Sequence, residues 1–458
     1  MGRFDAIIIG SGQAGPSLAA RLTDAGMTVA FIERTHFGGT CVNDGCIPTK
    51  ALVASARTAH VARRAADYGV TISGPVGVDM TAVKARKDAI VAKSRSGVEN
   101  WVRGMKGCTV VLGNARFVAP KEVRVGDDIL AADRIFINVG GRPTVPPIPG
   151  LAEVPFLTNT SMMDLDDLPE HLVVLGGSYI GLEFAQMYRR FGSRVTVIEA
   201  LPRLVAREDE DISAAIAEIL AGEGIDVRTG AKVTAVTGRE GSVAVTIDTA
   251  QGGATVKGSH LLLAIGRRPN TDDLGLDTAG IAVDQRGYIV VDDQLRTNVP
   301  GIYALGDCNG RGAFTHTSYN DYEIVAANLL DNDPRRLGDR ITAYALYIDP
   351  PLGRCGLTEA EVRSSGRPAL AATWPMTRVG RATERSETQG FMRIIVDRDT
   401  KQILGASLLG INADEVVHAI ADLMYAKAPY TVLQRAMHIH PTVSEYLPTM
   451  LENLAPLT

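Results

Sequence analysis

The sequence has no excess of basic residues, no long hydrophobic run and few aromatic residues. Its 458 residues include 47 Lys and Arg against 52 Asp and Glu, which gives a formal net charge of -5. Non-specific binding to nucleic acid requires surplus positive charge, so we expect no nucleic-acid partner. No segment reaches the roughly 18 uninterrupted apolar residues of a membrane span, and the apolar run at 6–9 is too short for a signal peptide. We therefore expect a cytoplasmic protein with no membrane partner.

Cysteine is also scarce, which argues against a disulfide framework. The chain has five cysteines, at Cys41, Cys46, Cys108, Cys308 and Cys355. Cys41 and Cys46 lie close together at the start of a helical stretch. Two cysteines so placed can form a strained, reducible disulfide, and the helix dipole lowers the pKa of a thiol in the first turn. Structural burial and half of a zinc site are the alternatives, but zinc needs two more Cys or His ligands and none lies nearby. We expect a reactive dithiol and no bound metal.

Glycine, in contrast, is abundant at 47 residues, and hydrophobic residues make up 45% of the chain. Glycine permits tight turns and close approach of the backbone to ligands. At roughly 150 residues per domain, the length favours about three domains.

Two segments, 6–33 and 172–199, share one pattern of apolar strand, glycine turn, amphipathic helix and second strand ending in Glu. In the first segment, Gly10, Gly12 and Gly15 follow the strand, and Glu33 lies eighteen residues after the last of them. This is the context of a dinucleotide-binding fingerprint, in which the helix N-terminus favours the pyrophosphate and the acid accepts from ribose hydroxyls. A plain tight turn is the alternative for glycines alone.

The second segment departs from the fingerprint at one position. Its glycines are Gly176, Gly177 and Gly181, and Ser178 occupies the middle fingerprint position. Glu199 ends the second strand, and its charge suits a ribose diol and repels a 2′-phosphate. We expect a second nucleotide, NADH in preference to NADPH. NADPH stays possible because Arg203 lies close by in sequence.

The two units resemble an internal duplication, because each is followed by a strand that ends in glycine, at Gly140 and at Gly266. Four prolines in 143–150 predict a boundary near residue 148, and a charged, proline-containing stretch at 331–336 predicts a softer one. Beyond it we expect strands at 391–397 and 403–409 and helices at 413–426 and 443–454. The predicted fold class is α/β, with two Rossmann-like dinucleotide-binding domains and an α+β C-terminal domain.

Three separated motifs resemble the FAD-dependent pyridine nucleotide-disulfide oxidoreductases, a family that includes dihydrolipoamide dehydrogenase, glutathione reductase and mercuric reductase. The first is the run 38–50, which contains both close cysteines. The second, Thr297-x-x-Pro-Gly-Ile-Tyr-Ala-Leu-Gly-Asp307, is similar to the family's second FAD motif. The third is His440-Pro-Thr-Val-Ser-Glu445, similar to the family's acid/base histidine with an orienting glutamate. The resemblance covers essentially the whole chain.

The resemblance implies a relay of electrons from NAD(P)H through FAD to a Cys41–Cys46 disulfide. It implies that Cys46 contacts the flavin, that Cys41 attacks the substrate, and that His440 comes from the partner subunit of a homodimer, with Glu445 fixing its tautomer. Lys50 and Glu183 match the family's ion pair beside the flavin. The implied cofactor-binding residues are Gly10, Gly12, Gly15, Glu33, Gly39, Thr40, Gly140, Asp307, Gly176, Gly177, Gly181, Glu199 and Gly266.

The same resemblance divides the chain into an FAD-binding domain (1–147 and 270–338), an NAD(P)-binding domain (148–269) and a dimerisation domain (339–458). No cysteine pair follows Glu445, although mercuric reductases use such a pair to hand over the metal. The segments 40–43 and 51–57 nevertheless look more like mercuric reductase than dihydrolipoamide dehydrogenase.

We expect a mercuric reductase-like enzyme that reduces a small-molecule disulfide or a metal ion. A dihydrolipoamide dehydrogenase is the alternative, and a nucleotide-responsive flavoprotein without dithiol turnover is the alternative from another class. Asp44, between the cysteines, is the least expected residue of the redox motif. Its carboxylate is expected to disfavour a nearby thiolate and anionic disulfides, or else to be a first-turn acid of the helix.

Overall fold

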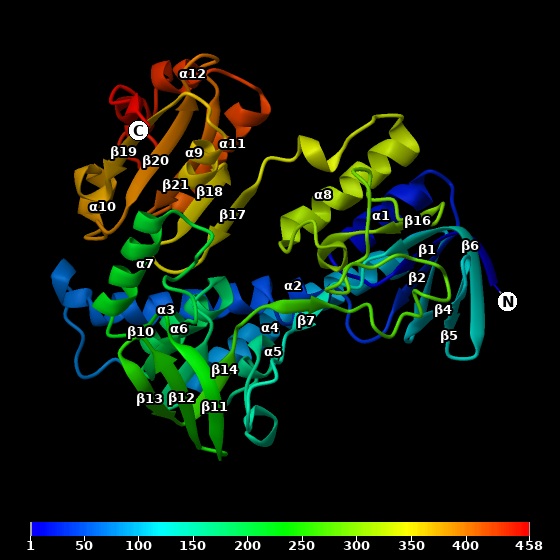
Figure 1. Cartoon of the computed structure of the whole chain (residues 1–458), viewed down its shortest axis with the longest axis horizontal. Helices are drawn as coiled ribbons and strands as arrows, with labels where there is room; N and C mark the ends of the chain where they lie inside the picture. Colours follow the sequence, from blue (N-terminus) through cyan, green and yellow to red (C-terminus); the bar gives the residue numbers. More distant parts are fainter. Residues whose placement is uncertain (1, 458) are drawn as a thin grey trace.

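The structure is a computed structural model that describes residues 2–457. Figure 1 shows three groups of elements: the first sheet on the right, the second unit at the lower left and the C-terminal sheet at the upper left. No helix among the described residues is long and apolar enough to cross a membrane.

The first sheet has the strand order β3-β2-β1-β6-β5-β4, and β16 pairs with β6. Its core strands are parallel, with Ala6 opposite Val29 and Ile7 opposite Ile135, as a doubly wound unit requires. The strands are β1 Gly2–Ile9, β2 Val29–Glu33, β3 Cys108–Leu112, β4 Ala115–Ala119, β5 Glu122–Val125, β6 Asp128–Ile137 and β16 Ile302–Ala304. The accompanying helices are α1 Ala14–Asp24, α2 Gly39–Asn43, α3 Cys46–Arg63, α4 Met80–Gly104 and α8 Thr315–Ala326.

The second unit repeats this arrangement on a smaller scale. Its parallel sheet has the order β10-β9-β8-β14, and a separate antiparallel sheet is formed by β11, β12 and β13. Along β8, Val174 packs in the core formed with α6, whereas Val173 and Leu175 pack with the antiparallel strands, since strand side chains alternate between faces. The elements are β8 His171–Leu175, α6 Tyr179–Phe191, β9 Arg194–Ile198, α7 Glu210–Gly222, β10 Asp226–Arg228, β11 Lys232–Arg239, β12 Ser242–Thr249, β13 Gly252–Gly258, β14 His260–Leu263 and the short α5 Asn159–Met162.

Two short strands, β7 Gly141–Pro143 and β15 Arg267–Pro269, pair antiparallel where the chain passes between the first sheet and the second unit. The later β16 lies in the first sheet although it follows the second unit in sequence. This pairing agrees with a discontinuous first domain, and the boundaries at 148, 269 and 339 stay predictions.

The C-terminal sheet is antiparallel and has the order β17-β18-β21-β20-β19-β22. The predicted strands β20 Phe391–Asp397 and β21 Ile403–Leu409 are confirmed, and the helix expected at 413–426 is α11 Ala413–Tyr425. The helix expected at 443–454 is shorter, because α13 spans only Tyr446–Leu451. The remaining elements are β17 Ala343–Leu346, β18 Leu352–Gly356, β19 Ala369–Pro375, β22 Ala455–Pro456, α9 Glu359–Ser364, α10 Gly380–Glu384 and α12 Tyr430–Arg435.

Candidate active site

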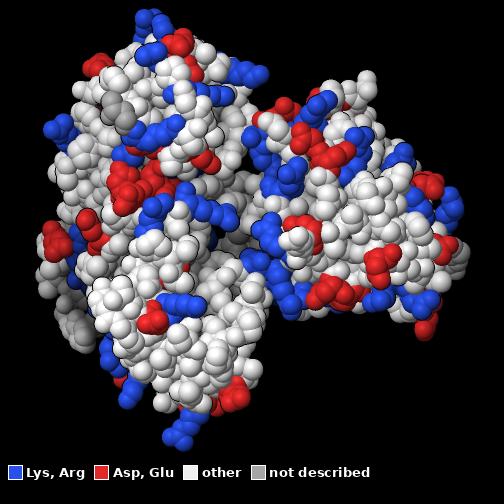
Figure 2. All heavy atoms as spheres, viewed as in Figure 1, with Lys and Arg blue, Asp and Glu red and all other residues white. Residues whose placement is uncertain are grey.

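A large cavity of about 1020 Å³ lies where the three groups of elements meet. Figure 2 shows the molecule hollowed between its lobes, with Lys and Arg side chains along this hollow. Arg142 and Arg267 belong to the cavity wall, and guanidinium groups suit phosphate-bearing ligands. The predicted site residues on the wall are Gly10, Gly12, Glu33, Gly39, Thr40, Cys41, Cys46, Lys50, Gly140, Glu183 and Asp307.

The glycine turn after β1 is shaped for close approach to a ligand. Gly10 has φ +99°, and a Cβ there would overlap the Asn138 carbonyl oxygen. A Cβ on Gly15 would lie 2.5 Å from the Gly10 carbonyl oxygen, so glycine lets α1 pack on the turn. Gly140 has φ +63° and nothing within 4 Å of its Cβ position, so this wall of the cavity is open. The turn, the N-terminus of α1 and this open space fit a dinucleotide such as FAD.

Glu33 also makes hydrogen bonds within the protein that the motif alone does not reveal. One carboxylate oxygen accepts hydrogen bonds from the Ser11 N–H (3.0 Å) and the Ser11 hydroxyl (2.6 Å), and the other accepts from the Thr35 N–H (2.8 Å). The carboxylate therefore fixes the glycine turn in the conformation that receives the nucleotide.

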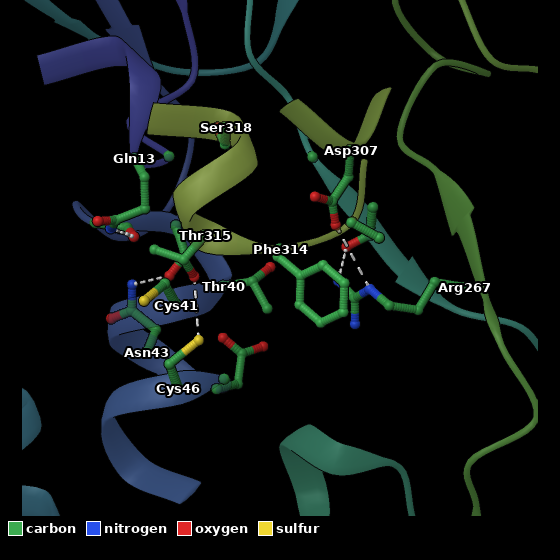
Figure 3. A pocket seen from close by; sticks show the side chains of 18 of the residues that line it. Gln13, Thr40, Cys41, Asn43, Cys46, Arg267, Asp307, Phe314, Thr315 and Ser318 are labelled. Carbon is green, nitrogen blue, oxygen red and sulfur yellow. Dashed lines mark hydrogen bonds and ion pairs between the residues drawn. The ribbon is translucent and has the colours of Figure 1, made fainter. Parts of the chain in front are cut away.

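The two redox-motif cysteines lie on different helices. Cys41 is in α2, Cys46 is the first residue of α3, and both are free thiols in this structure. The Cys46 Sγ lies 3.1 Å from the Thr315 hydroxyl oxygen at the start of α8, as Figure 3 shows. The short helix α2 brings Cys41 beside Cys46, so the predicted pair does meet across the cavity wall.

The two thiols have opposite tendencies to ionise. The hydrogen bond from Cys41 lowers the pKa of Cys46 to about 6, with further help from Thr315 and the charge of Lys50. That same hydrogen bond and burial raise the pKa of Cys41. Cys46 is therefore the thiolate and Cys41 the thiol near neutral pH.

The expected ion pair is present beside the thiols. Lys50 Nζ lies 2.7 Å from a Glu183 carboxylate oxygen, and the other oxygen accepts a hydrogen bond from the Tyr347 N–H at 3.0 Å. Lys50 also lies over the Tyr347 ring, 4.5 Å from its centroid. The pair joins α3 to α6, so the redox helix is tied to the second unit.

Asp307 lies at the far end of the cavity in Figure 3, in a 3₁₀ turn at Gly306–Asn309. Burial raises the pKa of Asp307, and the Arg267 guanidinium 3.8 Å away lowers it. A half-buried carboxylate that faces a cavity suits hydrogen bonds from ligand hydroxyls, as expected for a ribityl chain.

The predicted nucleotide-binding residues of the second unit are not part of the wall of this cavity, although Glu183 of the same unit is. Gly176 has φ +111°, and a Cβ on Gly181 would overlap the Gly176 carbonyl oxygen, which repeats the packing of the first turn. Glu199 accepts from the Gly177 N–H at 2.7 Å and from the Leu201 N–H at 2.8 Å. Gly266 ends the strand region before β15 and accepts from the Thr144 N–H.

Arg203, considered from sequence as a reader of a 2′-phosphate, is engaged within its own loop. Its Nη2 donates to the Ala206 carbonyl at 3.2 Å and to the Glu208 carbonyl at 3.4 Å. These bonds compete with any movement of the guanidinium towards a nucleotide.

Asp44 is not a first-turn acid of the redox helix, which corrects one of the two expectations for it. It caps the C-terminal end of α2, and its carboxylate accepts from the Thr160 hydroxyl at 2.8 Å. The amide of Asn159 donates to the Asp44 carbonyl at 2.7 Å. The charge of Glu183 raises the pKa of Cys46. Asp44 therefore fastens the redox loop to α5.

His440 and Glu445 form the expected pair, but outside the cavity. The His440 Nδ1 lies 2.8 Å from a Glu445 carboxylate oxygen, and the His440 side chain is 80% exposed. This exposure excludes a core histidine. The neighbouring Met437 and Ile439 are also exposed, at 99% and 80%.

Several residues of the cavity wall carry no motif in the sequence. They are Thr315, Tyr179, Phe314, His316, Tyr344 and Tyr347. They come from α8, from α6 and from the segment that includes β17, and only the packing of three separate segments brings them together. A weak signal existed for Tyr179 alone, since it lies within the second glycine turn.

Comparison with known proteins agrees with this geometry. The family model described as pyridine nucleotide-disulphide oxidoreductase matches residues 4–321, and the model of that family's dimerisation domain matches residues 342–451. The chain belongs to the pyridine nucleotide-disulphide oxidoreductases, which are FAD-dependent and take electrons from NAD(P)H. The predicted α/β fold class with a C-terminal dimerisation domain is thereby confirmed.

Individual relatives span almost the whole chain. The probable pyridine nucleotide-disulfide oxidoreductase RclA of Escherichia coli is 38% identical, with 98% of each chain covered. A mercuric reductase of Streptomyces lividans is 36% identical (97% of this chain, 94% of the relative), and a dihydrolipoyl dehydrogenase of Bacillus subtilis is 32% identical (96% and 94%). The solved structure of the HOCl-induced flavoprotein disulfide reductase RclA from E. coli superimposes with a TM-score of 0.90 at 37% identity, covering 98% of this chain and 99% of that one.

Proposed function

We propose that this oxidoreductase passes electrons from NAD(P)H through FAD to the Cys41–Cys46 pair and from there to a small disulfide or a metal ion. The split ionisation of the two thiols carries the proposal, since one thiolate beside one thiol is the state that a reduced relay requires. Bound FAD supplies hydride acceptance from the nicotinamide and two-electron reduction of the disulfide.

The residues of the chain provide the remaining steps for a disulfide acceptor. Cys41 loses its proton to a base, attacks one sulfur of the acceptor and forms a mixed disulfide, while the other sulfur leaves as a thiol with that proton. Cys46 then attacks Cys41, which restores the Cys41–Cys46 disulfide and releases the second half of the acceptor. Because the hydrogen bond with Cys46 and burial raise the pKa of Cys41, the first step needs a base, and His440 oriented by Glu445 has that chemistry.

His440 would reach the dithiol of a second copy of the chain. The His440–Glu445 pair is exposed beside Met437 and Ile439, and the segment lies at the end of the match to the family's dimerisation domain. A homodimer in which each subunit completes the other's site accounts for a catalytic pair on the surface.

A metal ion is the second candidate acceptor. One relative is a mercuric reductase, and one solved relative is a Cu(II) complex of RclA. Thiolates favour soft metal ions such as mercuric or cuprous ions. No group of three His, Cys, Asp or Glu side chains is arranged to hold a metal within residues 2–457, so we place the metal on the dithiol itself, as substrate.

The test is an anaerobic titration of the FAD-loaded protein with NADH and with NADPH. We expect the long-wavelength absorbance of a thiolate beside the oxidised flavin after two electrons. Turnover should then be compared across lipoamide, oxidised glutathione, and mercuric and cupric ions. Full reduction of the flavin with no such absorbance, and no turnover with any acceptor, would contradict a dithiol relay and favour a flavoprotein without dithiol turnover.

His440→Ala tests the proposed base separately. Loss of a general acid/base costs about 10²- to 10⁴-fold in turnover. A disulfide-reductase rate within a few-fold of the wild type would show that His440 is structural. Co-expression of His440→Ala chains with Cys41→Ser chains should restore one functional site per mixed dimer, if the histidine acts across subunits.

A further inference from the structure

A buried carboxylate lies behind the cavity wall and has no role in the relay described above. Glu208, only 2% exposed, ends the loop that follows β9. One of its oxygens accepts hydrogen bonds from the hydroxyls of Tyr179 (2.9 Å) and Tyr344 (2.6 Å). The other oxygen lies 3.1 Å from Arg354, which is itself 1% exposed. The buried guanidinium compensates the charge of the carboxylate and keeps it available as an acceptor.

The two tyrosines belong to a continuous aromatic surface on the cavity wall. The Phe314 and Tyr344 rings are stacked, with centroids 5.4 Å apart and an interplanar angle of 12°. The Tyr179 ring meets both of them edge-on, at 6.2 Å and 5.6 Å. The His316 ring is also stacked with Phe314, with centroids 5.3 Å apart. These four residues all line the cavity, and Figure 3 shows the Phe314 ring within it.

Both phenols are hydrogen-bond donors at ordinary pH. Burial, followed by the charge of Glu208, raises the pKa of Tyr179 and of Tyr344. A single oxygen of Glu208 therefore orients two rings that come from different segments, one from the start of α6 and one from β17.

The loop that carries Glu208 is also attached to the glycine turn of the second unit. At its start Glu199 accepts from the Gly177 N–H, and in its middle the Val205 N–H donates to the Gly177 carbonyl at 2.8 Å. Val205 is buried and has φ +39°, a conformation that a β-branched residue adopts only when its surroundings impose it. The loop 199–209 is thus hydrogen-bonded at one side to the glycine turn of the second unit and at the other to the aromatic residues of the cavity wall.

We propose that Glu208 is a positioning residue for hydride delivery: it holds Tyr179 and Tyr344 in the wall between the second glycine turn and the Lys50–Glu183 pair. Tyr179 lies two residues after Gly177 and one helical turn before Glu183 on α6, and both Tyr179 and Glu183 line the cavity. The inference rests on the proposed function, because it assigns Glu208 to the nicotinamide side of that relay.

Three substitutions isolate the role of Glu208. Tyr179→Phe and Tyr344→Phe each remove one hydroxyl and keep the ring, whereas Glu208→Leu keeps the approximate size and removes the oxygen to which both hydroxyls donate. Tyr303→Phe is the matched control, because the Tyr303 ring stacks on Phe136 in the first sheet and is not part of the cavity wall.

The holoenzymes should be compared in two half-reactions and in nucleotide binding. Flavin reduction by NADH is followed by stopped flow, and the reoxidation of dithionite-reduced enzyme by 5,5′-dithiobis(2-nitrobenzoate) is followed separately. The dissociation constant of NAD⁺ is measured by calorimetry. We expect Glu208→Leu and Tyr179→Phe to slow flavin reduction and weaken NAD⁺ binding by about tenfold each, the weight of one buried hydrogen bond, and to leave reoxidation within twofold.

Double variants give a signature that general destabilisation lacks. Because both hydroxyls donate to one oxygen, Tyr179→Phe combined with Glu208→Leu should be no worse than Glu208→Leu alone. Additive losses, equal losses in both half-reactions, faster flavin reduction or unchanged rates and binding would each overturn the positioning role. If Glu208→Leu does not fold, Tyr179→Phe and Tyr344→Phe decide, because each must slow flavin reduction and leave reoxidation within twofold. A wild-type protein that neither NADH nor NADPH reduces would instead contradict the proposed function.

Discussion

The two βαβ units share a hydrogen bond that their glycine motifs do not reveal. In each unit the glutamate at the end of the second strand accepts a hydrogen bond from a backbone N–H of the glycine turn. The donor is Ser11 in the first unit (3.0 Å) and Gly177 in the second (2.7 Å). The acid that is expected to read ribose therefore also fixes the turn that receives pyrophosphate.

The units differ in what covers the turn. The first turn is covered by the segment that leads into the redox helices, where a Cβ on Gly39 would lie 2.8 Å from the Gly12 Cα. The second turn is covered by its own loop, with Leu204 against Gly177. Equivalent positions after the two turns, Gln13 and Tyr179, bond to the covering segments, at the Gly38 carbonyl and at Glu208. The same glycine turn thus lies beside the redox helices in the first unit and beside its own loop in the second, and the covering segment determines which kind of site the turn belongs to.

The largest effect should come from the dithiol, which only the first unit carries. Cys41→Ser and Cys46→Ser should each abolish turnover with disulfides or metal ions, because neither can form the redox disulfide, and FAD should stay bound. Long-wavelength absorbance should persist in Cys41→Ser and vanish in Cys46→Ser, since Cys46 is the thiolate. Spectra of the reduced variants check this, and the reverse pattern would exchange the two roles.

Substitution of the two glutamates, Glu33 and Glu199, should affect the binding of FAD and of the nicotinamide nucleotide separately. Glu33→Ala removes three hydrogen bonds to a carboxylate and should weaken FAD binding by about 10- to 100-fold. Glu199→Ala should leave FAD bound and lower the preference for NADH over NADPH by about tenfold, because a carboxylate repels the 2′-phosphate.

FAD retention after gel filtration and the NADH/NADPH ratio of kcat/KM check this pair of variants. Arg203→Ala is the companion of Glu199→Ala. A wild type that prefers NADPH and loses that preference in Arg203→Ala would contradict the assignment of Glu199.

A pH titration should show how far Lys50 and Thr315, which neighbour the redox pair of the first unit, tune the ionisation of its thiols. The Cys46 thiolate exists above its pKa of about 6, so the long-wavelength absorbance of the reduced enzyme should fall as the pH drops through about 6. Lys50→Met and Thr315→Val remove groups that lower this pKa, so their midpoints should move to higher pH. Lys50→Arg keeps the charge and serves as the control. Unshifted midpoints in both variants would show that Cys41 alone sets the ionisation.

The smallest effect should follow from giving the second turn the middle glycine of the first. Ser178 is exposed at the N-cap of α6 and its side chain makes no capping bond, so Ser178→Gly should change NADH affinity by less than about threefold. Gly12→Ser is the reciprocal change, and its Cβ would lie 3.1 Å from the Asn138 amide nitrogen beside the FAD turn. FAD loss is expected only for Gly12→Ser, and equal losses in both variants would mean that the turns are equivalent.

Local sequence predicted the elements and the chemistry of this protein well. Strand periodicity located β20 and β21, and glycine spacing located both nucleotide turns, because these features depend on neighbouring residues. The close cysteines and the His440–Glu445 pair were likewise visible, since each pair lies within a few residues of sequence. The helix expected at 443–454 was too long, because helical periodicity does not reveal where tertiary packing ends a helix.

Only the tertiary structure decided how these parts act on one another. The ionisation of Cys46 depends on Thr315 and Lys50, and the aromatic wall depends on Glu208, which lies 29 residues after Tyr179 and 136 before Tyr344. The sequence suggested that the charge of Asp44 acts on the nearby thiolate. The structure shows that its carboxylate accepts a hydrogen bond from the Thr160 hydroxyl and so attaches the redox loop to α5. Sequence determines which groups exist and their local conformation. Hydrogen bonds and charges act over a few ångströms, so the distances set by packing determine which groups influence the thiols and the cofactor sites.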